Sequence, residues 1–225
     1  MLQSATGIMA RLKNDTLEHH KRAESKPLER ALVRGAISRE LYCDYLTQRL
    51  HIHEALDAAV RRLCETDSRL GELMSSELYQ TPRLRDDLRS LGVDATARSP
   101  HAATVRLIAD LDSSRTACAT SLLGAYYVFE GSKNGARFIS RALRPALGLM
   151  GPTGWSYLDP HAEQQSMLWG AFKQRVDAIE FTEVEMNAMV ALAAKTFDRI
   201  GELDDEIWGA HASEEATPRC PVTGR

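Results

Sequence analysis

The chain lacks long apolar runs and any marked excess of one charge. No stretch approaches the ~20 apolar residues that cross a bilayer, so we expect no transmembrane helix. The segment Met1 to Ala10 has no basic part followed by an uninterrupted apolar one, which argues against a secretory signal. Because 28 basic and 31 acidic side chains nearly balance, to a formal net charge of −3, the chain offers no basic field for nucleic acid.

Cysteine is also scarce. The 225 residues contain four cysteines, which are widely spaced and form no CxxC pair. Cys43, Cys64 and Cys118 fall in predicted helices among apolar residues, where a buried free thiol is the simplest interpretation. These features predict a reduced, cytoplasmic protein.

The chain does have helical periodicity almost throughout, because its apolar positions recur mostly at intervals of three and four residues. Helices are predicted over residues 8–24, 27–35, 38 to beyond 63, 69–79, 82–91, 101–147 with a break near 112–114, 161–179 and 182–208. Ser38 should cap the third of these, and Thr182 with Glu185 should form a capping box at the start of the last.

The remaining segments complete a simple domain organisation. Residues 148–160 hold three glycines and two prolines and are expected to form a loop. Residues 209–225 are polar and are expected to be a disordered tail. No strand, internal repeat or linker is evident, so we predict an all-α multi-helix bundle with a single domain over residues 1–208, in which the helix that contains residues 131–135 is kinked.

Two glycines inside a predicted helix, Gly131 and Gly135, are the most informative feature. Glycine in a helix interior costs about 1 kcal/mol relative to alanine, so two glycines one turn apart need a reason. They can serve close packing between helices, or they can kink the helix and let its backbone approach a flat ligand. Phe138 could flank an apolar plate, while Ser132 and Asn134 place hydrogen-bonding groups beside the glycines.

A histidine in the first predicted helix supplies a candidate ligand for a metal. His20 and Glu24 are four residues apart, so they share one face of the helix. A metal-bound histidine commonly passes its other ring proton to a carboxylate, a role that Glu24 can fill. Such a pair is more often a solvated contact, but together with the glycine helix it favours a haem held between two helices.

These segments resemble those of haem oxygenases. Residues 12–24, with the pattern Leu-Lys-x-x-Thr-x-x-x-His-x-x-x-Glu, are similar to the proximal helix of that family, and residues 124–143 are similar to the distal helix of its bacterial members. The stretch 169–182, with its Trp-x-x-Phe-Lys-x-x-Val pattern, is similar to the next helix of the family. The resemblance covers roughly residues 8–207.

The resemblance implies an activity and a role for each matching residue. His20 would be the axial ligand of haem b, Glu24 its partner, and Gly131, Ser132, Asn134 and Gly135 the distal wall. Further contacts to haem, including its propionates, would come from Lys13, Tyr126, Tyr127, Phe138, Lys173 and Arg175. The implied reaction cleaves haem, which is both cofactor and substrate, with O2 and electrons to biliverdin, carbon monoxide and ferrous iron. A ferredoxin or a flavin reductase would donate the electrons.

Departures from the family pattern leave a second haem function open. Ala136 replaces the second glycine of the usual pair, Asn134 stands where bacterial members commonly have leucine, and Ser132 replaces the aspartate of animal members. The amide of Asn134 could donate a hydrogen bond in the distal pocket or block it. A haem-binding sensor or carrier without turnover is therefore an alternative.

Two other motifs offer candidate sites. His51 and Glu54 share a helix face and suggest a non-haem dimetal oxygenase on the same fold, although no paired Glu-x-x-His motif accompanies them. A solvated cluster is the simpler interpretation. Cys220-Pro221 resembles a short haem regulatory motif, but a dipeptide occurs readily by chance.

Overall fold

The computed structural model describes residues 7–71, 73 and 78–215, without the side chains of 212–215. Within these residues the fold is all-α with no strand. The longer helices are α4 (Arg39–Thr66), α6 (Ala102–Ala117), α7 (Leu122–Ala146), α8 (Gln165–Asp177) and α9 (Glu183–Glu215). The shorter ones are α1 (Ile8–Asp15), α2 (Leu17–Glu24), α3 (Pro27–Arg34) and α5 (Thr81–Ser90). The all-α prediction is confirmed, and no helix in the described part is long and apolar enough to cross a membrane.

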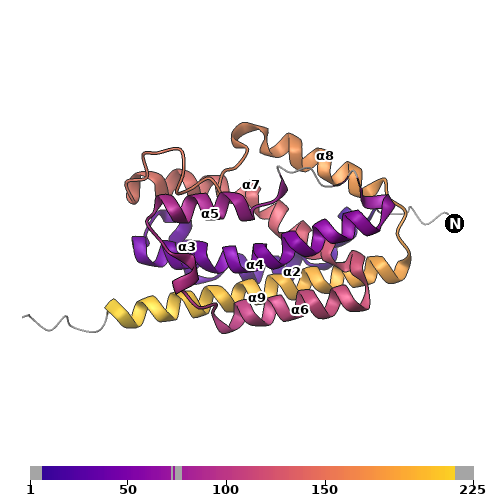
Figure 1. The fold of residues 1–225 in the computed structure, drawn as a ribbon, viewed down its shortest axis with the longest axis horizontal. Coiled ribbons are helices and arrows are strands. Elements are labelled where there is room, and N and C mark those ends of the chain that lie inside the picture. The colour runs from indigo at the N-terminus through magenta and orange to yellow at the C-terminus, as the bar shows by residue number, and fades with distance from the viewer. Residues whose placement is uncertain (1–6, 72, 74–77, 216–225) are drawn as a thin grey trace, which may run out of the picture.

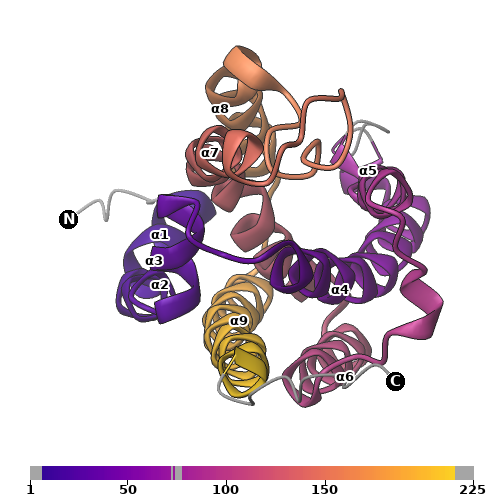
Figure 2. The ribbon, with the colours of Figure 1, turned by 90° about the vertical axis from the view of Figure 1, so that its left-hand side faces the viewer.

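The helices form a bundle around one apolar core. Helix α9 runs along one edge beside α6, and Figure 2 shows α1–α3 on one side, α4 and α5 on the other, and α7 with α8 above. The fully buried side chains include Leu12, Leu28, Leu46, Tyr126 and Phe172, each from a different helix. Burial of such side chains contributes about 1.5–3 kcal/mol apiece.

Helix boundaries follow local hydrogen bonding. The Ser38 hydroxyl accepts from the Leu41 amide at 3.1 Å, which confirms the predicted cap of α4. The helix predicted over 8–24 is divided at Thr16, whose buried hydroxyl donates to the Leu12 carbonyl at 2.7 Å. A hydroxyl bonded four residues back competes with regular helix geometry, which accounts for the division.

Three predicted boundaries differ from the structure. The long 101–147 segment is interrupted at Cys118, where the backbone is extended, rather than near 112–114. Of the helix expected over 69–79, the described residues show the 3-10 turn Ser68–Leu70, and the middle of the segment lies outside them. Helix α9 continues to Glu215, so residues 209–215 of the expected tail are helical. The side chain of His211 contacts Asp44 across 3.3 Å, which ties this extension to α4.

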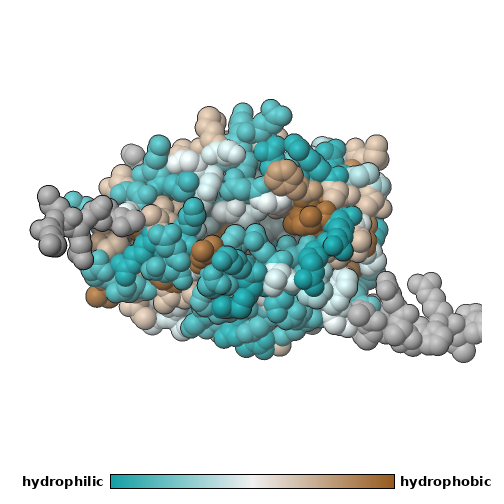
Figure 3. All heavy atoms as spheres, turned by 180° about the vertical axis from the view of Figure 1, so that it is seen from behind, coloured by the Kyte–Doolittle hydropathy of each residue, from teal (hydrophilic) through white to brown (hydrophobic). Residues whose placement is uncertain are grey.

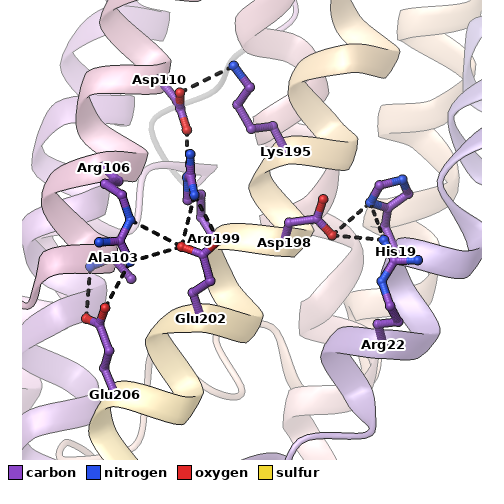
Figure 4. Close-up of polar contacts among 10 residues, drawn as sticks. All are labelled: His19, Arg22, Ala103, Arg106, Asp110, Lys195, Asp198, Arg199, Glu202 and Glu206. Atoms are coloured by element: carbon purple, nitrogen blue, oxygen red, sulfur yellow. Dashed lines mark hydrogen bonds and ion pairs between the residues drawn. The ribbon is translucent and has the colours of Figure 1, made fainter.

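Charged side chains fix α9 against its neighbours (Figure 4). On the α6 side, Arg199 donates to Asp110 of α6 at 2.8 Å, and it also donates to Glu202 of its own helix at 2.8 Å. On the α2 side, Asp198 accepts from His19 at 2.8 Å and from Arg22 at 3.1 Å. Because His19 and Arg22 flank His20 in α2, Asp198 sets the position of the helix that carries His20.

The start of α9 gives a prediction for the pH dependence of stability. Glu185 accepts from the Thr182 amide at 2.8 Å and Thr182 accepts from the Glu185 amide, so the predicted capping box is confirmed. Hydrogen bonds from Arg69 and Thr182 lower the pKa of Glu185 to about 2, from 4.5. A carboxyl whose pKa is lowered by folding stabilises the fold at every pH above the pKa that the same carboxyl has in the unfolded chain. We expect this stabilisation to be lost as pH falls from about 4.5 to about 2.

Thermal unfolding followed by circular dichroism across this pH range tests the expectation. Glu185→Gln should flatten the decline in unfolding temperature below pH ~4.5, because the amide does not titrate. Glu183→Gln, two residues earlier and more exposed, is the matched control. An identical decline in wild type and Glu185→Gln would contradict the role of this carboxylate.

Candidate functional site

A cavity of 1190 Å³ lies among α1, α2, α3, α7 and α8, and residues of α4 and α9 also line it. It is larger than the ~300–1,000 Å³ typical of small-molecule sites, which suits a large flat ligand. Figure 3 shows the side of the molecule on which α1–α3 lie, where a few apolar side chains interrupt a largely hydrophilic surface.

One wall of the cavity carries the predicted histidine. His20 is half-exposed, its Nε2 lies 3.1 Å from Oε1 of Glu24, and its ring centroid lies 5.1 Å from that of Phe197. The carboxylate occupies one ring nitrogen and leaves the other for a metal, an arrangement typical of metal-binding histidines. A cavity-lining histidine paired with a carboxylate in this way can serve as a metal ligand.

A second wall of the cavity is formed by α7. This helix continues through Gly131 and Gly135, and both line the cavity. A Cβ placed on Gly135 would meet nothing within 4 Å, so the helix backbone faces open space there. A Cβ on Gly131 would reach Trp169 at 3.6 Å, an ordinary contact. Gly135, more than Gly131, leaves room for a flat ligand to approach the backbone.

The polar neighbours of the glycines bond to their own helix. Ser132 donates to the Phe129 carbonyl at 2.8 Å, and the Asn134 amide donates to the Gly131 carbonyl at 3.0 Å. Both residues line the cavity, and so does Ala136. With its donor group engaged three residues back, Asn134 does not extend across the cavity as a blocking group.

Basic side chains without ion-pair partners in the described part of the chain also line the cavity. The sequence singled out Lys13 and Lys173, and the structure adds Arg30 and Arg34 from α3. The arginines are four residues apart and so share a face, a spacing that is visible in the sequence. These cations suit the carboxylates of a ligand such as haem.

The other predicted site residues divide according to helix face. Tyr127 lines the cavity and packs against Trp169, with ring centroids 5.7 Å apart. Tyr126, Phe138 and Arg175 do not line it. Tyr126 is buried on the opposite face of α7 and donates to the Leu78 carbonyl at 2.6 Å. Phe138 is 57% exposed and lies beside Arg137 and Arg141, while Arg175 is exposed on α8.

Buried polar residues at the cavity wall were missed by the sequence analysis. Arg49 and Tyr45 from α4 line the cavity, and so does Tyr157 from the loop after α7. Arg49 lies 4.8 Å from the Tyr45 ring centroid and pairs with the fully buried Asp204 of α9 at 3.4 Å. Burial raises the pKa of Tyr45 to about 12, so its hydroxyl stays neutral.

The alternative dimetal cluster is not assembled. His51 contacts the Arg98 carbonyl at 3.1 Å, and Glu54 accepts from Arg85 at 2.7 Å. Among the residues that the structure describes, no three histidine, cysteine, aspartate or glutamate side chains are grouped to hold a metal. Cys220 and Pro221 lie outside the described residues.

Comparisons with known proteins agree with the observed fold. Residues 6–204 match a family model described as heme oxygenase. The structure is similar to heme oxygenase-1 of the cyanobacterium Synechocystis, solved with heme, at TM-score 0.83 and 13% identity, covering 94% of this chain and 96% of that one. The structure is also similar to heme oxygenase-2 of Synechocystis, solved with heme and NO. The TM-score is 0.82 and the identity 20%, and the match covers 97% of this chain and 96% of that one.

The same fold also occurs in a protein that is not described as a haem oxygenase. A TenA homologue from P. horikoshii is similar at TM-score 0.62 and 15% identity, covering 91% of this chain and 99% of that one. No curated protein matched the sequence. At such low identities these likenesses concern the fold alone, and the assignment of function depends on the cavity.

Proposed function

Because the chain belongs to the haem oxygenase family, we propose that it binds haem b in the cavity with His20 as the axial ligand and degrades it with O2 and electrons. The products would be biliverdin, carbon monoxide and ferrous iron. The observation that supports this proposal most directly is that His20, its carboxylate partner Glu24 and the open backbone at Gly135 line the same cavity. Bound haem supplies both the iron that activates O2 and the macrocycle that is cleaved.

In this proposal the chain's own residues bind the haem, orient it and shield it from side reactions. Glu24 fixes the His20 ring, and Lys13, Lys173, Arg30 and Arg34 offer cations for the propionates. Tyr127 and Trp169 provide an apolar aromatic wall. Catalysis of this kind depends on positioning and on excluding side reactions rather than on a catalytic base. A ferredoxin or flavin reductase is proposed as electron donor.

Titration of the purified protein with haemin, followed by ascorbate in air, tests the proposal. We expect one equivalent of haemin to bind and its absorption band to convert to the broad band of biliverdin. Binding without conversion, also with a reductase as electron source, would favour a haem carrier or sensor. Absence of binding would refute both haem functions.

Filling the space beside Gly135 should abolish haem binding while the fold persists. Gly135→Leu places a side chain in the open cavity, and leucine has a higher helix propensity than glycine by up to ~1 kcal/mol. We expect saturation with haemin to be lost and thermal stability to be retained. Gly209→Leu, at an exposed glycine of α9 with equal free space, is the matched control and should bind haemin normally. Normal binding by Gly135→Leu would place the ligand elsewhere.

A further inference from the structure

Behind the cavity wall, three side chains form a line that the proposed function does not use. The Tyr157 hydroxyl lies 3.3 Å from Nε2 of His53, and Nδ1 of His53 lies 3.6 Å from Oδ1 of Asp57. Only Tyr157 of the three lines the cavity. All three are buried, with His53 1% exposed between the rings of Phe129 and Tyr157.

Asp57 is held as an ionised acceptor. Its Oδ2 accepts from the amides of Gln80 and Thr81, each at 2.9 Å, and from the Thr81 hydroxyl at 2.7 Å, at the start of α5. Although burial opposes ionisation, the neighbouring His53 ring and hydrogen bonds from Thr81 keep the pKa of Asp57 below its usual value. Oδ1 has no hydrogen-bond partner in the described part of the chain and faces His53.

This acceptor selects one tautomer of His53. Nδ1 of His53 likewise has no hydrogen-bond partner among the described residues, and the carboxylate opposite it favours a proton on that nitrogen. Nε2 then carries a lone pair and accepts the Tyr157 hydroxyl proton. With its proton directed inward, Tyr157 presents oxygen lone pairs at the cavity wall.

We propose that Tyr157 orders the water that delivers protons to the reaction in the cavity, and that His53 and Asp57 are positioning residues that fix the direction of its hydroxyl. This inference rests on the proposed function, which consumes protons. The charged and titratable groups around Tyr157 and His53 include Arg49 and Tyr45 of α4, Glu29 of α3, Asp57, and Asp87 of α5, which accepts from the Tyr157 backbone amide at 2.8 Å. Burial raises the pKa of Tyr157, so the group acts as a neutral hydroxyl throughout the working pH range.

The tautomer can be measured in the ligand-free protein by nitrogen-15 correlation spectroscopy of the histidine rings, with His53→Gln used to assign the signal. We expect His53 to be neutral with its proton on Nδ1. A proton on Nε2 would overturn the proposal, because Nε2 could not then accept from Tyr157. This measurement does not depend on haem, so it tests the hydrogen-bonding arrangement of Tyr157, His53 and Asp57 even if the proposed function fails.

The rate at which bound haemin is converted in the presence of ascorbate supplies the second measurement. Tyr157→Phe should bind haemin as wild type does and slow its conversion by ascorbate about 10-fold, below the ~10²–10⁴-fold attributed to direct general acid–base catalysis. His53→Leu should show the same loss, and His53→Gln should restore the rate, because a glutamine oxygen can accept from Tyr157. Tyr126→Phe is the matched control, since that buried hydroxyl bonds Leu78 away from the cavity.

The outcomes are distinct. Wild-type rates in Tyr157→Phe, or equal losses in His53→Gln and His53→Leu, would overturn the role of the hydroxyl direction. If the wild-type protein binds haemin without converting it, the proposed function fails and the water-ordering role fails with it. The tautomer then still reports whether the three side chains are aligned as inferred.

Discussion

Replacement of His20 with alanine is expected to weaken haemin binding more than truncation of any other side chain that lines the cavity. Loss of a partner of a metal ligand typically costs ~10–100-fold in affinity, and loss of the ligand itself should exceed this range. Glu24→Gln should lower the haemin affinity by ~10–100-fold, because the glutamine amide still contacts the His20 ring but lacks the charge of the carboxylate. Optical titration of the three proteins with haemin measures the difference. His20 is half-exposed, so the fold should be retained.

Two controls make this result specific. His51→Ala removes a histidine that contacts the Arg98 carbonyl outside the cavity and should leave haemin affinity unchanged. Imidazole added to His20→Ala should restore part of the wild-type spectrum, because the space left by the ring lies on the cavity wall. Equal affinity of His20→Ala and wild type would show that another residue ligates the haem.

Removal of Asp204 is expected to have the largest effect on stability. Its carboxylate is fully buried in α9 and pairs with the equally buried Arg49 of α4 at 3.4 Å. Asp204→Ala removes the carboxylate that pairs directly with the buried guanidinium of Arg49, a change that typically costs about 3–5 kcal/mol. Chemical denaturation followed by circular dichroism should show this loss in the free energy of unfolding.

The neighbouring residue provides a matched control. Asp205 lies on the same helix, is half-exposed and pairs with Lys26. Asp205→Ala should cost at most about 1 kcal/mol, as is usual for surface pairs. The double variant Arg49→Met with Asp204→Leu should recover much of the loss, because neither charge remains buried. Equal destabilisation by Asp204→Ala and Asp205→Ala would contradict the importance of the buried pair.

Residues four apart in one helix could be paired from the sequence, because helix geometry alone places them together. His20 and Glu24 are in contact as their spacing predicts. Gly131 and Gly135 both lie on the cavity for the same reason, since they share one face of α7. The caps at Ser38 and Thr182 were also predictable, because they depend on residues within one turn.

Which face of a helix meets the cavity could not be predicted in the same way. Tyr126 and Tyr127 are adjacent and chemically alike, yet only Tyr127 lines the cavity, because successive helix residues point ~100° apart. His51 and His53 show the same ambiguity. The sequence favoured His51 as the candidate ligand, whereas His53 is the buried one.

The sequence by itself determined the helical class, the haem oxygenase resemblance and the histidine–glutamate pair, because each depends on spacing along the chain. The tertiary structure decided the composition of the cavity. Arg49 meets Asp204 across 155 positions, and His53 meets Tyr157 across 104. Such contacts depend on how whole helices and loops pack, and no local pattern records the partner of a side chain so distant along the chain.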